Sequence, residues 1–276
     1  MKTKVISIMS QKGGVGKSTL TNTIVLDWCF REVLRTKKMP KILLIDADAQ
    51  ASVSSLRKRD VDFCKLDLEG KEFQQMDAGT QIAIKEMRSQ FHALYEKVGW
   101  TYYPIFTINV HDDGSTLHRA IEIIDNNEYE YVFIDMPGTL YQSGTADLLL
   151  YLNYIIIPVL ISNYDIQSSL DFCKLISDEN FHKASAIKEI RWIFNKYEVI
   201  KNAKYDEIER EMILETKIPF LKTRIRNSTF YTTKNYNTLI PSTFRVNLNT
   251  DELVATPKIT NINDVTDELR KLVSEK

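Results

Sequence analysis

The sequence is poor in the residues that interrupt or cross-link a chain. It contains 9 glycines, 7 prolines and 3 cysteines among 276 residues, and no tract rich in glycine, serine or proline. Flexible linkers and low-complexity tails need such tracts, so we expect residues 1–276 to form a single domain. The cysteines Cys29, Cys64 and Cys173 lie far apart without a CxxC pair, which favours reduced thiols in a cytoplasmic protein.

A long hydrophobic run is also missing. The most apolar stretch, residues 148–161, is interrupted by Asn153 and Pro158, and it is shorter than the roughly 20 residues that a membrane-spanning helix needs. Met1 leads almost directly into a glycine-rich loop, without the charged-then-apolar pattern of a signal peptide. Both absences favour a cytoplasmic protein without a membrane span.

Charge is nearly balanced in total but not along the chain. The net charge is −1, yet no acidic residue lies between Glu215 and Asp251. That stretch carries six cations, namely Lys217, Lys222, Arg224, Arg226, Lys234 and Arg245. A local excess of positive charge can bind a polyanion even when the total is near zero. A solvated basic surface is the alternative interpretation.

Strand-like apolar segments alternate with helix-like segments along most of the chain. The expected strands are residues 4–10, 41–46, 102–109, 129–135, 154–160 and 190–197. The expected helices are residues 18–36, 115–127 with Ser115 as N-cap, 166–180, 205–217 and 262–275, with residues 53–99 as further helices and loops. This order predicts an α/β fold in three layers, with a mostly parallel central sheet flanked by helices. Ligands of such sheets bind at the carboxyl ends of the strands.

The segment MSQKGGVGKST, residues 9–19, has the composition of a phosphate-binding loop. It fits the strand–GxxxxGK[ST]–helix pattern except that Gln11 replaces the first glycine. With this loop, the expected α/β fold is of the P-loop NTPase type. The backbone N–H groups of such a loop and the following helix N-terminus bind phosphate. The expected nucleotide contacts are Gly13, Gly14, Val15, Gly16, Lys17 at the β- and γ-phosphates, Ser18 at Mg²⁺ and Thr19 at the α-phosphate.

A second lysine, Lys12, precedes the glycines. In this feature the loop resembles that of the ParA/MinD family of deviant Walker-type ATPases, and most closely the partition ATPases without an N-terminal helix-turn-helix. The resemblance implies that Lys17 serves the protein's own nucleotide, while Lys12 reaches the partner's phosphates across an ATP-sandwich homodimer. A cation delivered in this way can act like an arginine finger, which is worth ~10³–10⁵ in rate. The slow hydrolysis of the family implies a smaller contribution from Lys12.

Two further motifs resemble those of the family. LLIDADAQAS, residues 43–52, ends a strand with Asp46 and Asp48, which share one face because they are two residues apart. The resemblance implies that Asp48 orients or activates the attacking water and that Asp46 supports Mg²⁺. YVFIDMPG, residues 131–138, supplies Asp135 for the Mg²⁺ shell. Ala49 and Gly138 stand where the family usually has proline. Two weaker matches suggest base contacts from Asn195 and Pro219.

The resemblance implies slow, Mg²⁺-dependent and partner-stimulated ATP hydrolysis. The acid-free stretch favours an ATP dimer that binds DNA without sequence preference, through Lys222, Arg224 and Arg226. Such a switch would act in plasmid, chromosome or mobile-element partitioning and would be nucleoid-associated when ATP-bound. Because the loop starts so early, we expect no helix-turn-helix before it to read operator DNA.

A MinD-like ATPase that positions a protein partner or membrane complex is the alternative. The last helix opposes membrane binding, since it carries four acids and an apolar stripe suited to docking on the protein. A metal-cluster carrier would need paired cysteines, and Cys173 has no apparent partner.

Overall fold

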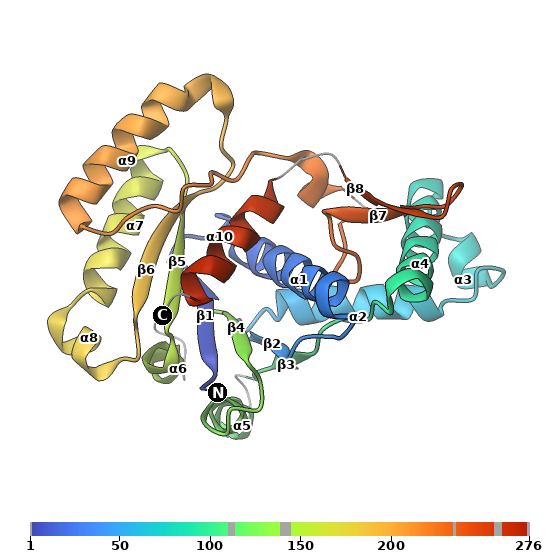
Figure 1. Cartoon of the computed structure of the whole chain (residues 1–276), viewed down its shortest axis with the longest axis horizontal. Coiled ribbons are helices and arrows are strands. Elements are labelled where there is room, and N and C mark those ends of the chain that lie inside the picture. Colours follow the sequence, from blue (N-terminus) through green and yellow to red (C-terminus); the bar gives the residue numbers. More distant parts are fainter. Residues whose placement is uncertain (1, 110–113, 139–144, 234–235, 257–260, 275–276) are drawn as a thin grey trace.

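The computed structural model describes residues 2–109, 114–138, 145–233, 236–256 and 261–274 (Figure 1). A six-stranded sheet runs through the centre in the order β3-β2-β4-β1-β5-β6, and its strands pair in parallel. The strands are β1 (Lys4–Ile8), β2 (Ile42–Asp46), β3 (Ile105–Thr107), β4 (Tyr131–Asp135), β5 (Tyr154–Val159) and β6 (Glu189–Phe194). The expected P-loop NTPase-type fold is confirmed.

Helices cover both faces of the sheet, as its apolar strands require. One face packs against α1 (Lys17–Thr36), α10 (Ile262–Ser274) and the end of α4 (Ala78–Val98). The other face packs against α5 (Ser115–Asp125), α6 (Thr145–Tyr151), α7 (Asn163–Ile176) and α9 (Asn202–Thr216). The remaining helical elements are α2 (Ser52–Lys65), α3 (Lys71–Gln74), α8 (Glu179–Ala184), η1 (Val199–Lys201) and η2 (Thr229–Thr232).

Alternation along the strands divides the core into two halves. On β1, Val5 faces the α5–α9 layer, whereas Ile6 and Ile8 face the α1–α10 layer. Because successive side chains point to opposite faces, one short strand supplies both halves. The strands run parallel, so the carboxyl ends of β1, β2 and β4 reach the same edge of the sheet.

The sequence located every strand of the central sheet, and the differences lie at element ends. The third strand is only Ile105–Thr107, because Pro104 has no N–H to extend the pairing before it. Helix α7 begins at Asn163, because the Ser162 side chain accepts a hydrogen bond from the Asp165 N–H, and it ends at Ile176. Ser115 is the first helical residue and not the N-cap, a position that Gly114 takes with a left-handed φ of 89°.

A two-stranded antiparallel hairpin is absent from the sequence-based expectations. It consists of β7 (Phe244–Asn247) and β8 (Glu252–Ala255), and Asp251 in its turn adopts a φ of 55°. Phe244 packs against Phe30 of α1, with ring centroids 5.2 Å apart. The hairpin therefore joins the acid-free stretch to the α1 layer.

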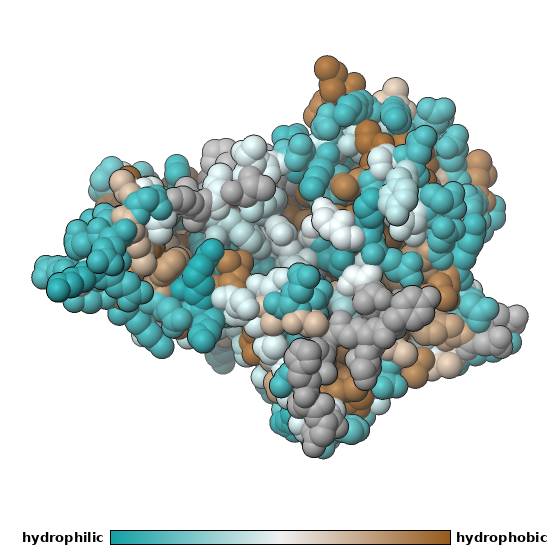
Figure 2. Space-filling view, turned by 180° about the vertical axis from the view of Figure 1, so that it is seen from behind, coloured by the Kyte–Doolittle hydropathy of each residue, from teal (hydrophilic) through white to brown (hydrophobic). Residues whose placement is uncertain are grey.

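The last helix docks on the protein as its apolar stripe predicts. Val265, Leu269 and Val273 are fully buried, and α10 lies along α1. In the described ranges we found no helix with the length and hydrophobicity to cross a membrane. Figure 2 shows one face of the molecule, where teal side chains predominate and brown ones form separate small groups.

We predict that Leu269→Ala lowers the free energy of unfolding by about 2–5 kcal/mol, because it removes buried methyl groups and leaves a cavity. Urea unfolding measures this difference. The matched control is Leu214→Ala on α9, where the leucine is 70% exposed and a change within about 0.5 kcal/mol is expected. Equal losses in both variants would contradict the docking of α10.

Candidate nucleotide and magnesium site

The glycine loop between β1 and α1 has the backbone of a phosphate cradle. Gly14 and Gly16 adopt left-handed φ values of 74° and 91°, which cost little only for glycine. At Gly16 a Cβ atom would lie 2.8 Å from the Asn195 side-chain nitrogen, so a larger residue cannot be accommodated without movement. Helix α1 begins directly after it, and its unpaired N–H groups point toward the loop.

Lys17 lies between the loop and the carboxylates. Its Nζ donates a hydrogen bond to the Lys12 carbonyl at 3.2 Å. Burial lowers the pKa of Lys17, while the carboxylates of Asp135 and Asp48 oppose that shift. A Cβ atom at Gly138 would stand 3.5 Å from this Nζ. The glycine that stands in place of the family's proline therefore lies beside the Lys17 ammonium group.

Asp46 and Asp135 stand side by side at the end of the sheet. They are register partners on the parallel strands β2 and β4, and both are fully buried. The second oxygen of Asp46 accepts from the Ser54 N–H at 2.8 Å. Its first oxygen and both oxygens of Asp135 have no hydrogen-bond partner among the described residues. Such orphaned buried oxygens are costly.

Burial raises the pKa of Asp135 to about 7, and the Ser18 hydroxyl opposes this rise. The charges of Asp46 and Asp48 push the pKa of Asp135 further upward, against the Lys17 ammonium. Ser18 is near enough to favour the carboxylate but makes no bond of hydrogen-bond geometry with it. Burial also raises the pKa of Asp46, against the hydrogen bonds from Ser54. The charge of Lys17 alone is thus insufficient to keep the pKa values of Asp46 and Asp135 in their usual range.

This donor set fits a magnesium ion. Mg²⁺ is typically bound in proteins through one or two carboxylates, with waters and substrate phosphates completing the shell. Asp135, Asp46 and the Ser18 hydroxyl meet that description, and their unpartnered oxygens would gain a cation. The ion would neutralise the charge of the nucleotide's phosphates.

Asp48 lies beyond the end of β2 and is half-buried. Its first carboxylate oxygen accepts from the Gln50 N–H at 2.9 Å. Ala51, two residues later than Ala49, adopts a left-handed φ of 44° as the N-cap of α2. This turn connects Asp48 directly to α2, and it is the segment where the chain lacks the family's proline.

Lys12 is held by its own chain. Its Nζ forms an ion pair with Asp165 at 2.9 Å and lies 4.0 Å from the ring centroid of Tyr164. Burial would raise the pKa of Asp165, but the Ser162 hydroxyl and Lys12 outweigh it and lower that pKa. Sequence reasoning missed both Tyr164 and Asp165. Asp165 follows β5 as the third residue after the N-cap Ser162, a spacing that could have revealed it.

Asn195 secures the loop in this structure. Its side-chain N–H donates to the Val15 carbonyl at 2.7 Å, and its oxygen accepts from the Lys196 N–H. Lys196, which sequence reasoning also missed, donates to the Gly14 carbonyl at 3.2 Å. The expected base contact of Asn195 stays a prediction, at a position that touches the loop.

Pro219 does not reach this edge of the sheet. Its carbonyl accepts from the Trp192 N–H, so it lies level with the middle of β6. The end of β6 is instead level with Ile225, whose N–H donates a hydrogen bond to the Phe194 carbonyl. Pro219 thus lies several residues before the level at which β6 ends, and its base contact stays a prediction.

The three residues proposed to contact DNA differ in their exposure and in whether an acidic side chain already binds them. Lys222 and Arg226 are exposed. Arg224 is bound to Asp206 and Glu209, the latter at 2.7 Å, and its guanidinium stacks near Phe194 and Tyr205. Arg224 is therefore neutralised by α9, because acids distant in sequence meet a stretch that itself contains none. Lys234 lies outside the described residues.

The aromatic residues of the same stretch pack inward. Phe230, Tyr231 and Tyr236 contact one another with ring centroids 5.5–6.4 Å apart. The Tyr236 hydroxyl accepts from Asn22 of α1 at 2.9 Å. These rings anchor the basic stretch to the P-loop helix, so its cations and not its aromatic rings are the exposed groups.

The raised pKa of Asp135 predicts a stability that falls with pH in the absence of nucleotide. Between its ordinary value of 3.8 and about 7, the native state binds more protons than the unfolded state, so the free energy of unfolding decreases as pH rises. Asp135→Asn reduces this dependence, to which Asp46 also contributes, and is more stable than the wild type at pH 8, by about 2–4 kcal/mol. Urea unfolding across the pH range measures it.

The control for this measurement is Asp147→Asn, which changes an exposed carboxylate on α6. Its pH profile should run parallel to that of the wild type. A profile for Asp135→Asn that also runs parallel would mean that Asp135 is already ionised at low pH.

Three comparisons with known proteins identify relatives of the chain. Residues 3–188 match the family model of an AAA domain. The chain is 28% identical over 167 residues to the sporulation initiation inhibitor protein Soj of Bacillus subtilis (strain 168), a match that covers 59% of this chain and 61% of Soj. The chain thus spans less than two thirds of the length of this curated relative.

Two solved structures share the fold along their whole length. The MinD cell division protein of Aquifex aeolicus superposes with a TM-score of 0.56 at 18% identity, covering 99% of this chain and 98% of that one. A putative plasmid partition protein of Borrelia burgdorferi B31 bound to AMPPNP gives 0.56 at 20% identity and covers 100% of both. At these identities the likeness concerns the fold alone. The matched domain and the loop together place the chain in the AAA-domain family, among the ParA/MinD-type Walker ATPases.

Proposed function

We propose that this protein is an ATP-dependent molecular switch of one domain, residues 1–276. It binds ATP and Mg²⁺ at the loop, forms an ATP-sandwich dimer, and hydrolyses ATP slowly until a partner protein stimulates it. The observation that carries the proposal is the different placement of two lysines in one loop. Lys17 lies against the buried carboxylates, whereas Lys12 is held on Asp165 outside them.

The proposed mechanism assigns separate tasks to these residues. The loop N–H groups and Lys17 bind the phosphates, with Ser18 and Thr19 at the helix start. Asp135 and Asp46 hold Mg²⁺, and Asp48 orients or activates water. Lys12 leaves Asp165 when a second copy presents its nucleotide, and its charge then stabilises phosphoryl transfer in the partner's site.

DNA is the proposed polyanion. Lys222 and Arg226 are exposed in a stretch without acids, and the described residues include no carboxylate paired with either side chain. The fold shared with a putative plasmid partition protein supports a role in partitioning of a plasmid, chromosome or mobile element. The ATP-bound dimer would then be cytoplasmic and nucleoid-associated.

A MinD-like positioning role is the second candidate, supported by the fold shared with MinD. Membrane attachment through the last helix is disfavoured, because its apolar residues are already buried against α1. A protein partner remains compatible with this second candidate.

We predict that Lys12→Ala binds ATP with an affinity near that of the wild type but neither dimerises stably nor hydrolyses ATP. The physical reason is that Lys12 is held on Asp165, away from the nucleotide site of its own chain. The substitution therefore removes a positive charge only from the phosphates bound by the partner. Light scattering coupled to size exclusion, with ATP and Mg²⁺, measures the dimer. A Lys12→Ala protein that still dimerises would refute the role across the interface.

Two variants serve as controls for Lys12→Ala. Lys17→Ala should abolish nucleotide binding itself. Lys196→Ala removes a lysine that touches the same loop but has no task in the proposed dimer, so this variant should still dimerise.

We predict that Lys222→Gln and Arg226→Gln weaken ATP-dependent DNA retention and lower its salt slope by about 0.9 for each phosphate that the variant no longer neutralises. Filter binding over a range of salt concentrations measures both effects. Arg210→Gln on α9, an exposed arginine outside the stretch, is the matched control and should behave like the wild type. Retention that is absent with ATP, or insensitive to salt, would exclude DNA as the polyanion.

A further inference from the structure

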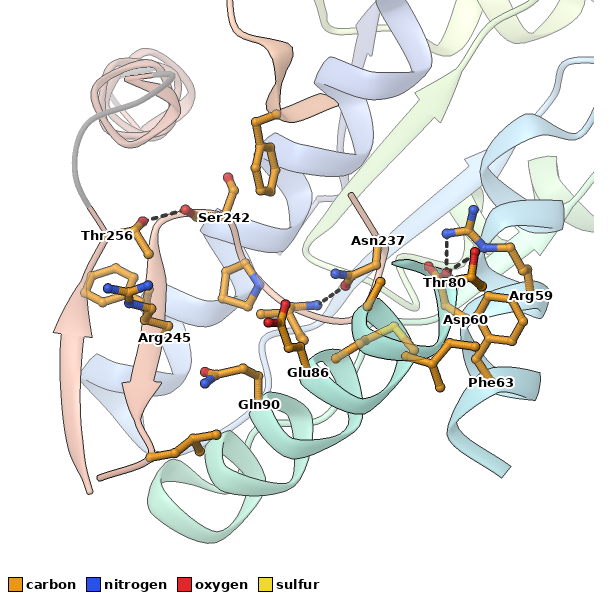
Figure 3. Close-up of a pocket in the computed structure, with 18 residues that line it drawn as sticks. Arg59, Asp60, Phe63, Thr80, Glu86, Gln90, Asn237, Ser242, Arg245 and Thr256 are labelled. Atoms are coloured by element: carbon orange, nitrogen blue, oxygen red, sulfur yellow. Dashed lines mark hydrogen bonds and ion pairs between the residues drawn. The ribbon is translucent and has the colours of Figure 1, made fainter. Parts of the chain in front are cut away.

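An apolar pocket lies between α2, α4 and the β7 strand (Figure 3), and the loop and carboxylates of the nucleotide site do not line it. Its volume is about 650 Å³, within the range of pockets that receive ligands or inserted side chains. We refer to it as the α4 pocket. Its apolar lining includes Phe63, Ala83, Ile84, Met87, Phe244 and Leu248.

The α4 pocket carries two opposite charges without partners. Glu86 and Arg245 lie on its rim in Figure 3, both exposed, and neither forms an ion pair with any described residue. Arg59 on the same rim is different, because Asp60 binds it at 2.6 Å and Asp60 is itself held by Thr238. The pocket therefore suits an apolar group that is flanked by one acid and one base.

The chain itself presents such a group on another face. Val199 and Ile200 at η1 are 66% and 92% exposed, and the sequence places Glu198 before them and Lys201 after them. Glu198 and Lys201 form a surface ion pair with each other at 2.8 Å, and among the described residues neither has another ion-pair partner. Such exposed pairs contribute little and exchange easily. We refer to residues 198–201 as the η1 turn.

The η1 turn and the α4 pocket cannot meet within one molecule. The turn directly precedes α9, and Figure 1 places α9 and α4 on opposite sides of the protein. Figure 2 shows brown side chains projecting from the top of the molecule, where Figure 1 places the start of α9. An apolar projection and an apolar pocket on different faces of one chain are complementary only between copies.

We propose that the η1 turn of one copy inserts into the α4 pocket of a second copy. Val199 and Ile200 enter the apolar lining, Glu198 meets Arg245, and Lys201 meets Glu86. The contact joins two different surfaces, so it is heterologous and leaves a free turn at one end and a free pocket at the other. It therefore produces open chains of copies, without nucleotide and separately from the sandwich dimer.

One turn in one pocket is a small contact, of the size typical of transient assemblies. Self-association should then appear at micromolar concentrations and grow with concentration. Sedimentation velocity of the full chain without nucleotide, from about 10 to about 300 µM, tests this range. The weight-average sedimentation coefficient should rise for the wild type and stay constant when either surface is changed.

Two variants each remove one half of the contact. Ile200→Asp removes the apolar group at an exposed position, and Ala83→Trp fills the pocket. Each should remain monomeric alone, but an equimolar mixture should form a dimer and nothing larger, because one variant keeps its pocket and the other its turn. Leu214→Asp, which alters another exposed leucine on α9, is the control and should associate like the wild type.

Leu248→Asp provides a second pocket variant at a position that is 56% exposed, in case Ala83→Trp unfolds. Thermal unfolding by circular dichroism checks each variant. Charge reversal tests the orientation, since Glu198→Arg and Arg245→Glu should each weaken association and their combination in one chain should restore it.

Three results would overturn the proposal. They are a wild type whose sedimentation is independent of concentration, association that survives Ile200→Asp, and a variant mixture that stays monomeric. A small molecule that copurifies in the α4 pocket, seen by native mass spectrometry and missing from Ala83→Trp, would likewise assign the pocket to another occupant. None of these results depends on ATP, so they leave the switch proposal to its own tests.

Discussion

Two carboxylates are buried side by side at the end of the parallel sheet, and Lys17 is the lysine that lies near them. The arrangement of the candidate site depends on this buried negative charge. Asp46 and Asp135 are register partners, and three of their four oxygens lack a hydrogen-bond partner among the described residues. Burying such groups is expensive unless a cation arrives. This edge of the sheet therefore needs positive charge. Lys17 of the loop supplies part of it, and a magnesium ion held by Asp46, Asp135 and the Ser18 hydroxyl would supply the rest.

The same edge is connected to the rest of the molecule by polar contacts that reach both layers. Lys12 forms an ion pair with Asp165 in the first turn of α7. Release of Lys12 would therefore leave a carboxylate of α7 without its cation. Asn22 on the P-loop helix binds both Tyr236 and Tyr103, and Thr238 is bound by Arg57 and Asp60 of α2. The basic stretch is thus fastened to the helix that follows the loop and to the helix that follows Asp48. These contacts connect both motifs to residues 236–238 of the basic stretch.

Much of the fold and the phosphate site could be predicted from sequence, because both depend on local patterns. Apolar runs located β1, β2, β4, β5 and β6, and the loop residues follow one another along the chain. The contacts of Lys12 with Asp165 and of Arg224 with Asp206 could not be predicted, since they join segments that only the sheet order brings together. The β7–β8 hairpin was missed because its strands are short and one carries charges on its exposed side. The level of Pro219 beside the middle of β6 could not be predicted, because a motif gives the order of residues in the chain and not their level along a strand.

We expect the carboxylate cluster to hold a proton until nucleotide and metal bind, because the pKa of Asp135 is raised to about 7. Calorimetric titration with ATP and Mg²⁺ in two buffers of different ionisation enthalpy measures the protons released on binding. Near pH 6.5 the wild type should release a fraction of a proton that disappears as the pH rises past about 7, and Asp135→Asn should release less. Equal proton release in wild type and variant, or none in either, would contradict this account of the site.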